Sequence, residues 1–182
     1  MAGNSHSLGS KVADVFRPRI NKGEVMDRKH FENAKFLPLI AELNAEGTMV
    51  TITAMGNSMR PFIESGHDEL VFFRFDTLKV GDVILAEVDP GHYVCHRIET
   101  IKDGMITMRG DGNVVGTETF PIENVRAKLV KIRRKGKVYD LETSKAWKLY
   151  SAIWPKLYPV RRYLLALYRL LWLHQLPERW KG

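Results

Sequence analysis

The sequence predicts a mainly β protein, in which an antiparallel sheet follows a helical N-terminal segment and precedes a helical tail. Two observations support this fold class: apolar and polar residues alternate with a period of two through the middle of the chain, and glycine-containing turns separate the alternating runs. The 182 residues suffice for one domain with an appendage. We divide the chain into an N-terminal segment (1–47), a β domain (48–141) and a tail (142–182).

The N-terminal segment is expected to contain one helix. Residues 1–26 have no clear pattern, but Asp27 can cap a helix that ends at Gly47. Pro38 lies inside this stretch and weakens the prediction. Apolar residues recur there at helical spacing: Phe31, Ala34, Leu37, Ile40 and Ala41. No apolar run at the N-terminus is long enough for a secretory signal, and no stretch of about 18 apolar residues predicts a transmembrane helix.

Six alternating runs predict the strands of the β domain. Turn motifs rich in glycine lie between most of them, which favours short antiparallel connections. The predicted strands cover residues 48–55, 68–75, 82–88, 92–101, 105–110 and 125–134.

The stretch MGNSMRPFI, residues 55–63, contains a candidate nucleophile, Ser58. A serine hydroxyl is a weak nucleophile unless a neighbouring base takes its proton. An isolated serine more commonly has a structural role, in which it lies in a turn and hydrogen-bonds to the backbone. The rest of the sequence must therefore supply a base.

A predicted hairpin supplies one. The pair Asp103-Gly104 lies between two alternating runs, which is the strongest local signal for a two-residue turn. Counting outward from that turn places Asp111 directly opposite His96. Opposed residues project from the same face of the sheet, so the carboxylate is expected to orient the imidazole and stabilise its charged form.

A metal site on the same strand is excluded by spacing. His92 and His96 are separated by about 13 Å of extended chain, too far for two ligands of one ion. Cys95 and Arg97 flank His96 and point to the opposite face, where we expect a packed thiol and a solvated guanidinium. We expect neither a metal nor a cofactor.

Four motifs in order, GNSMRPFI, VGDVILAEV, CHRIETI and MRGDGN, resemble the serine peptidase clan of type I signal peptidases and LexA-like self-cleaving repressors. The resemblance covers residues 48–141. It implies that Ser58 is the nucleophile and His96 the general base, as in the endoplasmic-reticulum and archaeal type, with Asp111 as the supporting aspartate. It also implies that small residues precede the cleaved bond.

The sequence departs from that family at two places. Gly56 stands where signal peptidases usually have a hydroxyl residue that assists the oxyanion hole. The family's second aspartate falls on Thr117, with Glu118 next to it. Four residues are expected to form the oxyanion hole and the wall beneath the substrate: Asn57, Ser58, Met59 and Pro61.

The tail carries the whole net charge. Residues 1–142 contain 20 Lys plus Arg and 20 Asp plus Glu, whereas residues 143–182 contain eight basic residues and one acid, Glu178. All four tryptophans lie in the tail, which reads as two helices broken at Pro155 and Pro159. A basic, aromatic helix suits peripheral contact with a membrane. Packing on the body is the alternative, and the broad apolar face disfavours nucleic acid as a partner.

These features predict a serine endopeptidase that cleaves an extended peptide or protein by Ser/His acyl transfer. A self-cleaving LexA-like regulator and a catalytically inactive peptide-binding module remain open. The single cysteine, Cys95, permits a reducing compartment, so we expect a cytoplasmic protein with the tail as a candidate peripheral contact to the membrane. The sequence predicts no oligomeric state.

Overall fold

The structure, a computed structural model, describes residues 40, 42, 43 and 47–173. Its described part is mainly β with one antiparallel sheet, as the sequence predicts. Of the predicted N-terminal helix, residues 40, 42 and 43 are helical, and the remainder lies outside the described residues.

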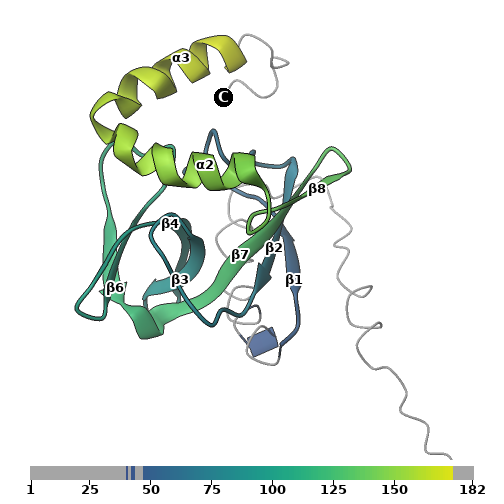
Figure 1. Cartoon of the computed structure of the whole chain (residues 1–182), viewed down its shortest axis with the longest axis vertical. Coiled ribbons are helices and arrows are strands. Elements are labelled where there is room, and N and C mark those ends of the chain that lie inside the picture. Colours follow the sequence, from purple (N-terminus) through teal and green to yellow (C-terminus); the bar gives the residue numbers. More distant parts are fainter. Residues whose placement is uncertain (1–39, 41, 44–46, 174–182) are drawn as a thin grey trace, which may run out of the picture. The chain divides into compact units, whose positions relative to one another are not determined.

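Eight strands form the sheet, in the order β1-β2-β7-β3-β4-β5-β6, with β8 also paired to β7 (Figure 1). Every pairing is antiparallel. The strands are β1 (Val50–Thr53), β2 (Asp68–Phe73), β3 (Val83–Asp89), β4 (His92–Lys102), β5 (Met105–Arg109), β6 (Glu118–Pro121), β7 (Val125–Arg134) and β8 (Lys137–Asp140), with a 3₁₀ turn, η1 (Ile122–Asn124), before β7.

All six predicted runs contain a strand, and β6 and β8 are additional. Both additional strands have only four residues, and β6 ends at Pro121, so neither shows a clear alternating run. The Asp103-Gly104 turn is confirmed, because both residues have positive φ (51° and 73°), which is the conformation of a type I′ hairpin.

The core lies on both sides of the central strand β3. Val83 and Leu85 belong to one apolar cluster, whereas Ile84 and Ala86 belong to a second. Alternate residues of a strand point to opposite faces, so β3 separates the two clusters. This burial on both faces explains the continuous apolar run in the sequence of β3.

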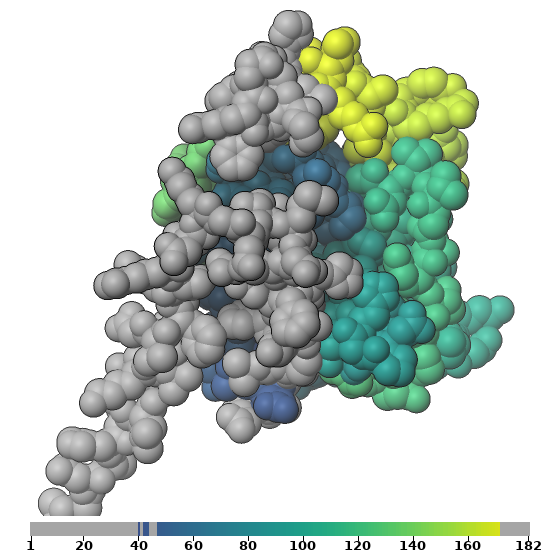
Figure 2. All heavy atoms as spheres, turned by 180° about the vertical axis from the view of Figure 1, so that it is seen from behind, coloured from purple at the N-terminus to yellow at the C-terminus, as the bar shows by residue number. Residues whose placement is uncertain are grey.

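The tail folds as α2 (Lys145–Ile153), the 3₁₀ segment η2 (Trp154–Val160) and α3 (Arg161–Leu173). Both predicted proline breaks fall within η2. Figure 1 shows α2 lying across one end of the curled sheet, and Figure 2 shows α3, in yellow, at the upper edge of the described surface. Trp147 and Tyr150 of α2 contact the ring of Phe62, with centroids 4.7 and 5.1 Å apart. The inner side of the tail therefore packs on the β domain.

Candidate active site

Ser58 lies in a turn between β1 and β2, where it is half-buried. Met59 and Phe62 are buried beneath the turn and fix it to the core. The amide of Ile63 donates to the Met59 carbonyl (2.9 Å), which closes one helical turn behind the serine. The amide of Gly112 donates to the Ser58 carbonyl (2.7 Å), so residues 57–64, which we call the nucleophile turn after the candidate role of Ser58, are bound to the loop that follows β5.

The far end of the nucleophile turn is held by charged groups. Arg134 donates to the Phe62 carbonyl (2.7 Å), and the buried Asp68 carboxylate accepts from the Glu64 amide (2.8 Å). The Tyr168 hydroxyl of α3 donates to the Glu64 carboxylate. Both strand and tail residues therefore fix this turn.

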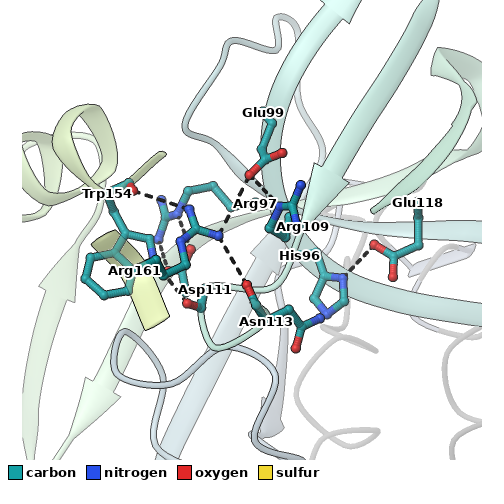
Figure 3. Close-up of polar contacts among 9 residues, drawn as sticks. All are labelled: His96, Arg97, Glu99, Arg109, Asp111, Asn113, Glu118, Trp154 and Arg161. Atoms are coloured by element: carbon teal, nitrogen blue, oxygen red, sulfur yellow. Dashed lines mark hydrogen bonds and ion pairs between the residues drawn. The ribbon is translucent and has the colours of Figure 1, made fainter. Parts of the chain in front are cut away.

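His96 of β4 is only 4% exposed, and its Nδ1 lies 2.9 Å from Glu118 Oε2 of β6 (Figure 3). An ionised carboxylate can only accept a hydrogen bond, so the Nδ1 of a neutral His96 carries the hydrogen. Its Nε2 then has a free lone pair, which is the tautomer that a general base requires.

Glu118 reaches His96 because of strand pairing. Ile98 is opposite Met108, and Met108 is opposite Glu118, so these three residues form one row across β4, β5 and β6. Opposed residues share a face of the sheet, and so do residues two apart on one strand. His96 is two residues from Ile98 and therefore lies on the face that carries Glu118.

Gly110 is where the nucleophile turn and the histidine meet. A Cβ atom at this position would collide with the Ser58 carbonyl oxygen and lie 2.9 Å from His96 Nε2. It would also lie 2.9 Å from the side-chain amide of Asn113. The imidazole, the Ser58 carbonyl and the Asn113 amide therefore all border the space that a side chain at position 110 would fill.

The prediction that Asp111 lies opposite His96 and orients it is wrong. The predicted register holds from Lys102–Met105 to Thr100–Thr107, and then a bulge at Glu99 shifts it by one residue. A shift of one residue reverses the face on which each side chain lies. Position 111 therefore falls on the side of Arg97, and Glu118 takes the place beside His96.

Asp111 instead forms a buried ion pair with Arg97. The guanidinium Nε and Nη2 donate to the two carboxylate oxygens at 2.8 and 2.7 Å. Arg97 also donates to the Gly81 carbonyl and to Ser151 Oγ of α2. With 2% of its surface exposed, Arg97 is not the solvated residue that the sequence predicts.

Two tail residues donate hydrogen bonds to the backbone of the loop of residues 110–113. The indole nitrogen of Trp154 donates to the Asp111 carbonyl (3.1 Å). Arg161, at the start of α3, donates to the Asn113 carbonyl (3.5 Å) and lies 3.8 Å from Glu99 (Figure 3). Burial lowers the pKa of Arg161, against the opposing effect of Asp111 and Glu99.

A groove of about 210 Å³ includes Ser58 in its lining. On one side lies β1 with the residues that follow it, and on the other lies the first part of β4. The lining is mostly apolar and consists of Ile52, Thr53, Ala54, Met55, Gly56, Ser58, Met59, Ile63, Leu70, Leu85, Tyr93, Val94 and Cys95.

Both walls of the groove are strand edges. Among the described residues, β1 pairs only with β2, and β5 pairs with β4 from Arg97 onward. The backbone of residues 92–96 therefore has no strand partner on the β5 side within the described part of the chain. An unpaired strand edge is a template for an extended peptide.

The thiol in the groove is not a nucleophile. Cys95 is half-buried, and the loss of hydration raises the pKa of its thiol to about 12. The neighbouring Arg97 opposes this shift, and Asp111 adds to it. The thiol therefore stays protonated near neutral pH, as expected for a packed side chain.

A larger cavity, of about 300 Å³, lies between α2 and the sheet. Its buried amine, Lys128 Nζ, lies 3.2 Å from Asp82 and 2.9 Å from Glu142. Burial lowers the pKa of Lys128, but the two carboxylates raise it by more, so the net shift of the pKa is upward. A lysine held in its charged form cannot act as a base. The hydroxyl of Ser151, which also lines this cavity, accepts a hydrogen bond from Arg97.

The predicted substrate-contact residues divide into two groups. Ser58 and Met59 line the groove, whereas Asn57 and Pro61 do not. The Ser58 hydroxyl and the amides of Asn57 and Ser58 make no hydrogen bond with any residue that the structure describes. These three groups are therefore available to a ligand.

Sequence reasoning missed Glu118 and Gly110 as site residues, and a signal existed for the first. Glu118 lies next to the position at which the resembling family has its second aspartate. Recognising β6 would have brought it onto the His96 face. Within the described residues, no three His, Cys, Asp or Glu side chains are grouped so that they could hold a metal ion.

Comparison of the sequence with models of known protein families and with curated proteins finds no match. The function of the site therefore rests on its own geometry.

Proposed function

We propose that this chain is a serine endopeptidase of the signal-peptidase and LexA-like type, which cleaves an extended peptide by acyl transfer. One observation carries the proposal: the backbone carbonyl oxygen of Ser58 and the Nε2 of His96 both border the space where a Cβ of residue 110 would stand, so the serine turn lies next to the imidazole. On the other side of the imidazole, the Glu118 carboxylate fixes the tautomer. A nucleophile, a base and an orienting carboxylate are the parts that acyl transfer requires.

The reaction proceeds in two halves. Ser58 Oγ attacks the scissile carbonyl carbon, and His96 Nε2 takes the hydroxyl proton. The tetrahedral intermediate then expels the amine, which receives that proton from His96, and an ester to Ser58 remains. Water attacks the ester carbonyl while His96 Nε2 takes its proton, and His96 returns that proton to Ser58 Oγ as the acid product leaves. Glu118 stabilises the imidazolium in both halves.

The oxyanion is stabilised by backbone donors. The amides of Ser58 and Asn57 have no partner among the described residues and precede the nucleophile directly. Gly56 adds no hydroxyl, and one missing donor costs roughly 3–4 kcal/mol of transition-state stabilisation. We therefore expect slow turnover.

The substrate lies in the groove as an added strand. Its backbone pairs with the free edge of β1 or of residues 92–96, and its side chains alternate between the apolar wall and solvent. The groove volume of about 210 Å³ suits small apolar side chains before the cleaved bond. Because the chain has one cysteine and needs no oxidising compartment, we propose that it acts in the cytoplasm.

The test uses a fluorophosphonate label together with a mixture of unfolded peptides read by mass spectrometry. The wild-type chain should be labelled at Ser58 and should create new peptide ends after small residues. Ser58→Ala and His96→Ala should lose both signals. Ser65→Ala is the matched control, because Ser65 is also half-buried and lies outside the groove lining.

The same experiment separates the alternatives. Conversion of purified wild-type protein, but not of Ser58→Ala, to a shorter chain would indicate self-cleavage. A folded wild-type chain with neither label nor new peptide ends would reject the peptidase and leave a peptide-binding module.

A further inference from the structure

The outer face of α3 is apolar and exposed. Arg161 and Leu165 are buried against the body, with 2% and 4% of their surfaces exposed. On the opposite side, Tyr163, Leu167 and Leu170 are 61%, 52% and 66% exposed. Their spacing of four and three residues places them in one stripe along the helix. A stripe of large apolar residues facing solvent indicates an interaction surface.

Positive charge accompanies this stripe. Arg162 and Arg169 are two helical turns apart and therefore lie on the same flank of α3. Residues 143–177 contain no Asp or Glu. All the exposed charges of residues 143–173 are therefore basic: Lys145, Lys148, Lys156, Arg162 and Arg169.

We propose that α3 docks on an anionic lipid surface, with Tyr163, Leu167 and Leu170 entering the headgroup region and the basic residues facing the lipid phosphates. This combination of an apolar stripe and basic flanks suits a helix that lies in the plane of the interface. The 13 residues of α3 span about 20 Å, short of the ~30 Å hydrocarbon core. No helix among the described residues is long and apolar enough to cross a membrane.

The charge argues against a second copy of the chain as the occupant. A symmetric pair of α3 helices would place the basic flank of one copy against that of the other, and like charges in contact disfavour association. A bilayer containing acidic lipids supplies the opposite charge over the whole face. Tyr168 donates to Glu64 and Arg161 to the Asn113 carbonyl, which fixes the inner side of the helix to the body, so the outer face is presented without refolding. The inference does not depend on the peptidase activity.

The experiment measures sedimentation of the full chain with vesicles of phosphatidylcholine alone or with about a third phosphatidylglycerol. Binding should require the acidic lipid and weaken, without vanishing, as salt shortens the screening length. Arg162→Gln with Arg169→Gln should lower the partition coefficient about 25-fold, because each basic residue near the surface contributes about fivefold. Leu167→Gln with Leu170→Gln should abolish binding in high salt.

Two matched controls remove the same groups elsewhere. Lys102→Gln with Lys137→Gln removes two exposed charges, and Val115→Gln with Val138→Gln removes two exposed apolar side chains of the β domain. Both controls should bind vesicles as the wild type does. Absence of binding by the wild-type chain would overturn the proposal, as would binding that the α3 variants leave unchanged. A dimer in solution that the α3 leucine variant dissociates would assign the face to a second copy instead.

Discussion

At the scale of single residues, Glu118 and Asp111 have different surroundings. Glu118 contacts the imidazole directly and is partly exposed, whereas Asp111 is buried and bound to Arg97. In the proposed mechanism, Glu118 is therefore the carboxylate placed to affect proton transfer, whereas Asp111 is placed to affect folding.

Glu118→Gln should lower the peptidase rate by about 10²–10⁴-fold, because an amide no longer enforces the tautomer or stabilises the imidazolium. The melting temperature should change little, since the carboxylate is 29% exposed and screened by solvent. Steady-state kinetics and a thermal melt measure the two effects. Glu123→Gln, an exposed acid in η1, is the control. An unchanged rate in Glu118→Gln would reject Glu118 as the orienting residue.

Asp111→Asn should lower the stability of the fold more than it lowers the peptidase rate. It leaves the Arg97 guanidinium buried without a counter-charge, which typically costs about 3–5 kcal/mol. Chemical denaturation should show this loss of stability. Any remaining folded protein should keep the His96–Glu118 contact and be labelled at Ser58. A variant that is fully stable but inactive would return Asp111 to the role that the sequence predicts.

Cys95 provides a test by pH. Since burial raises the pKa of its thiol to about 12, the native protein at pH 8 should react with iodoacetamide roughly 1,000-fold more slowly than the unfolded chain. The native rate should rise about tenfold with each pH unit, because it follows the thiolate fraction, and should level off only near pH 12. Mass spectrometry of native and urea-unfolded samples measures both rates. Equal rates at pH 8 would show that the thiol is hydrated.

At the scale of elements, the site is the contact between the nucleophile turn and the loop after β5. Gly112 donates to the Ser58 carbonyl, and Gly110 leaves no room for a side chain beside it. Two backbone segments meet there, so neither can yield by rotating a side chain.

Gly110→Ala should therefore push the nucleophile turn away from His96. Overpacking of this kind costs about 1–3 kcal/mol, and displacement of reacting groups by about 1 Å can cost 10²-fold in rate. Gly91→Ala is the control: its Cβ meets nothing within 4 Å, but its φ of +75° adds backbone strain. Denaturation should show both variants destabilised, whereas only Gly110→Ala should lose activity. Normal activity in Gly110→Ala would show that the two segments can separate freely.

At the scale of the whole molecule, the tail belongs to the framework of the site. Ser151 accepts a hydrogen bond from Arg97, and Trp154 donates one to the Asp111 carbonyl. Trp147 and Tyr150 contact the ring of Phe62 beneath the nucleophile turn. The inner face of the tail stabilises the β domain, and the outer face carries the proposed lipid contact.

A chain truncated after Glu142 should consequently lose cooperative folding, because the apolar surface around Phe62 becomes exposed and Arg97 loses a partner. Circular dichroism melts would measure this loss. A chain ending at Leu173 is the control, since it keeps every described contact. A sharp melt of the shorter chain near the wild-type temperature would show that the β domain folds without the tail.

The sequence by itself determined the β class, the positions of the strands with clear alternation and the hairpin turn at Asp103-Gly104. These features follow from side-chain period and turn chemistry, which are local. It also singled out Ser58 and His96 as candidates, because their motifs are contiguous.

Only the tertiary structure decided which carboxylate faces His96. The bulge at Glu99 reverses the faces beyond it, and nothing in the local pattern encodes a bulge. Glu118 arrives through a short strand 22 residues away, whose position depends on pairing with β5. The burial of Arg97 likewise depends on Asp111 and Ser151, which are distant in sequence. Side-chain facing in a sheet is set by long-range register, so a shift of one residue exchanged the two carboxylates.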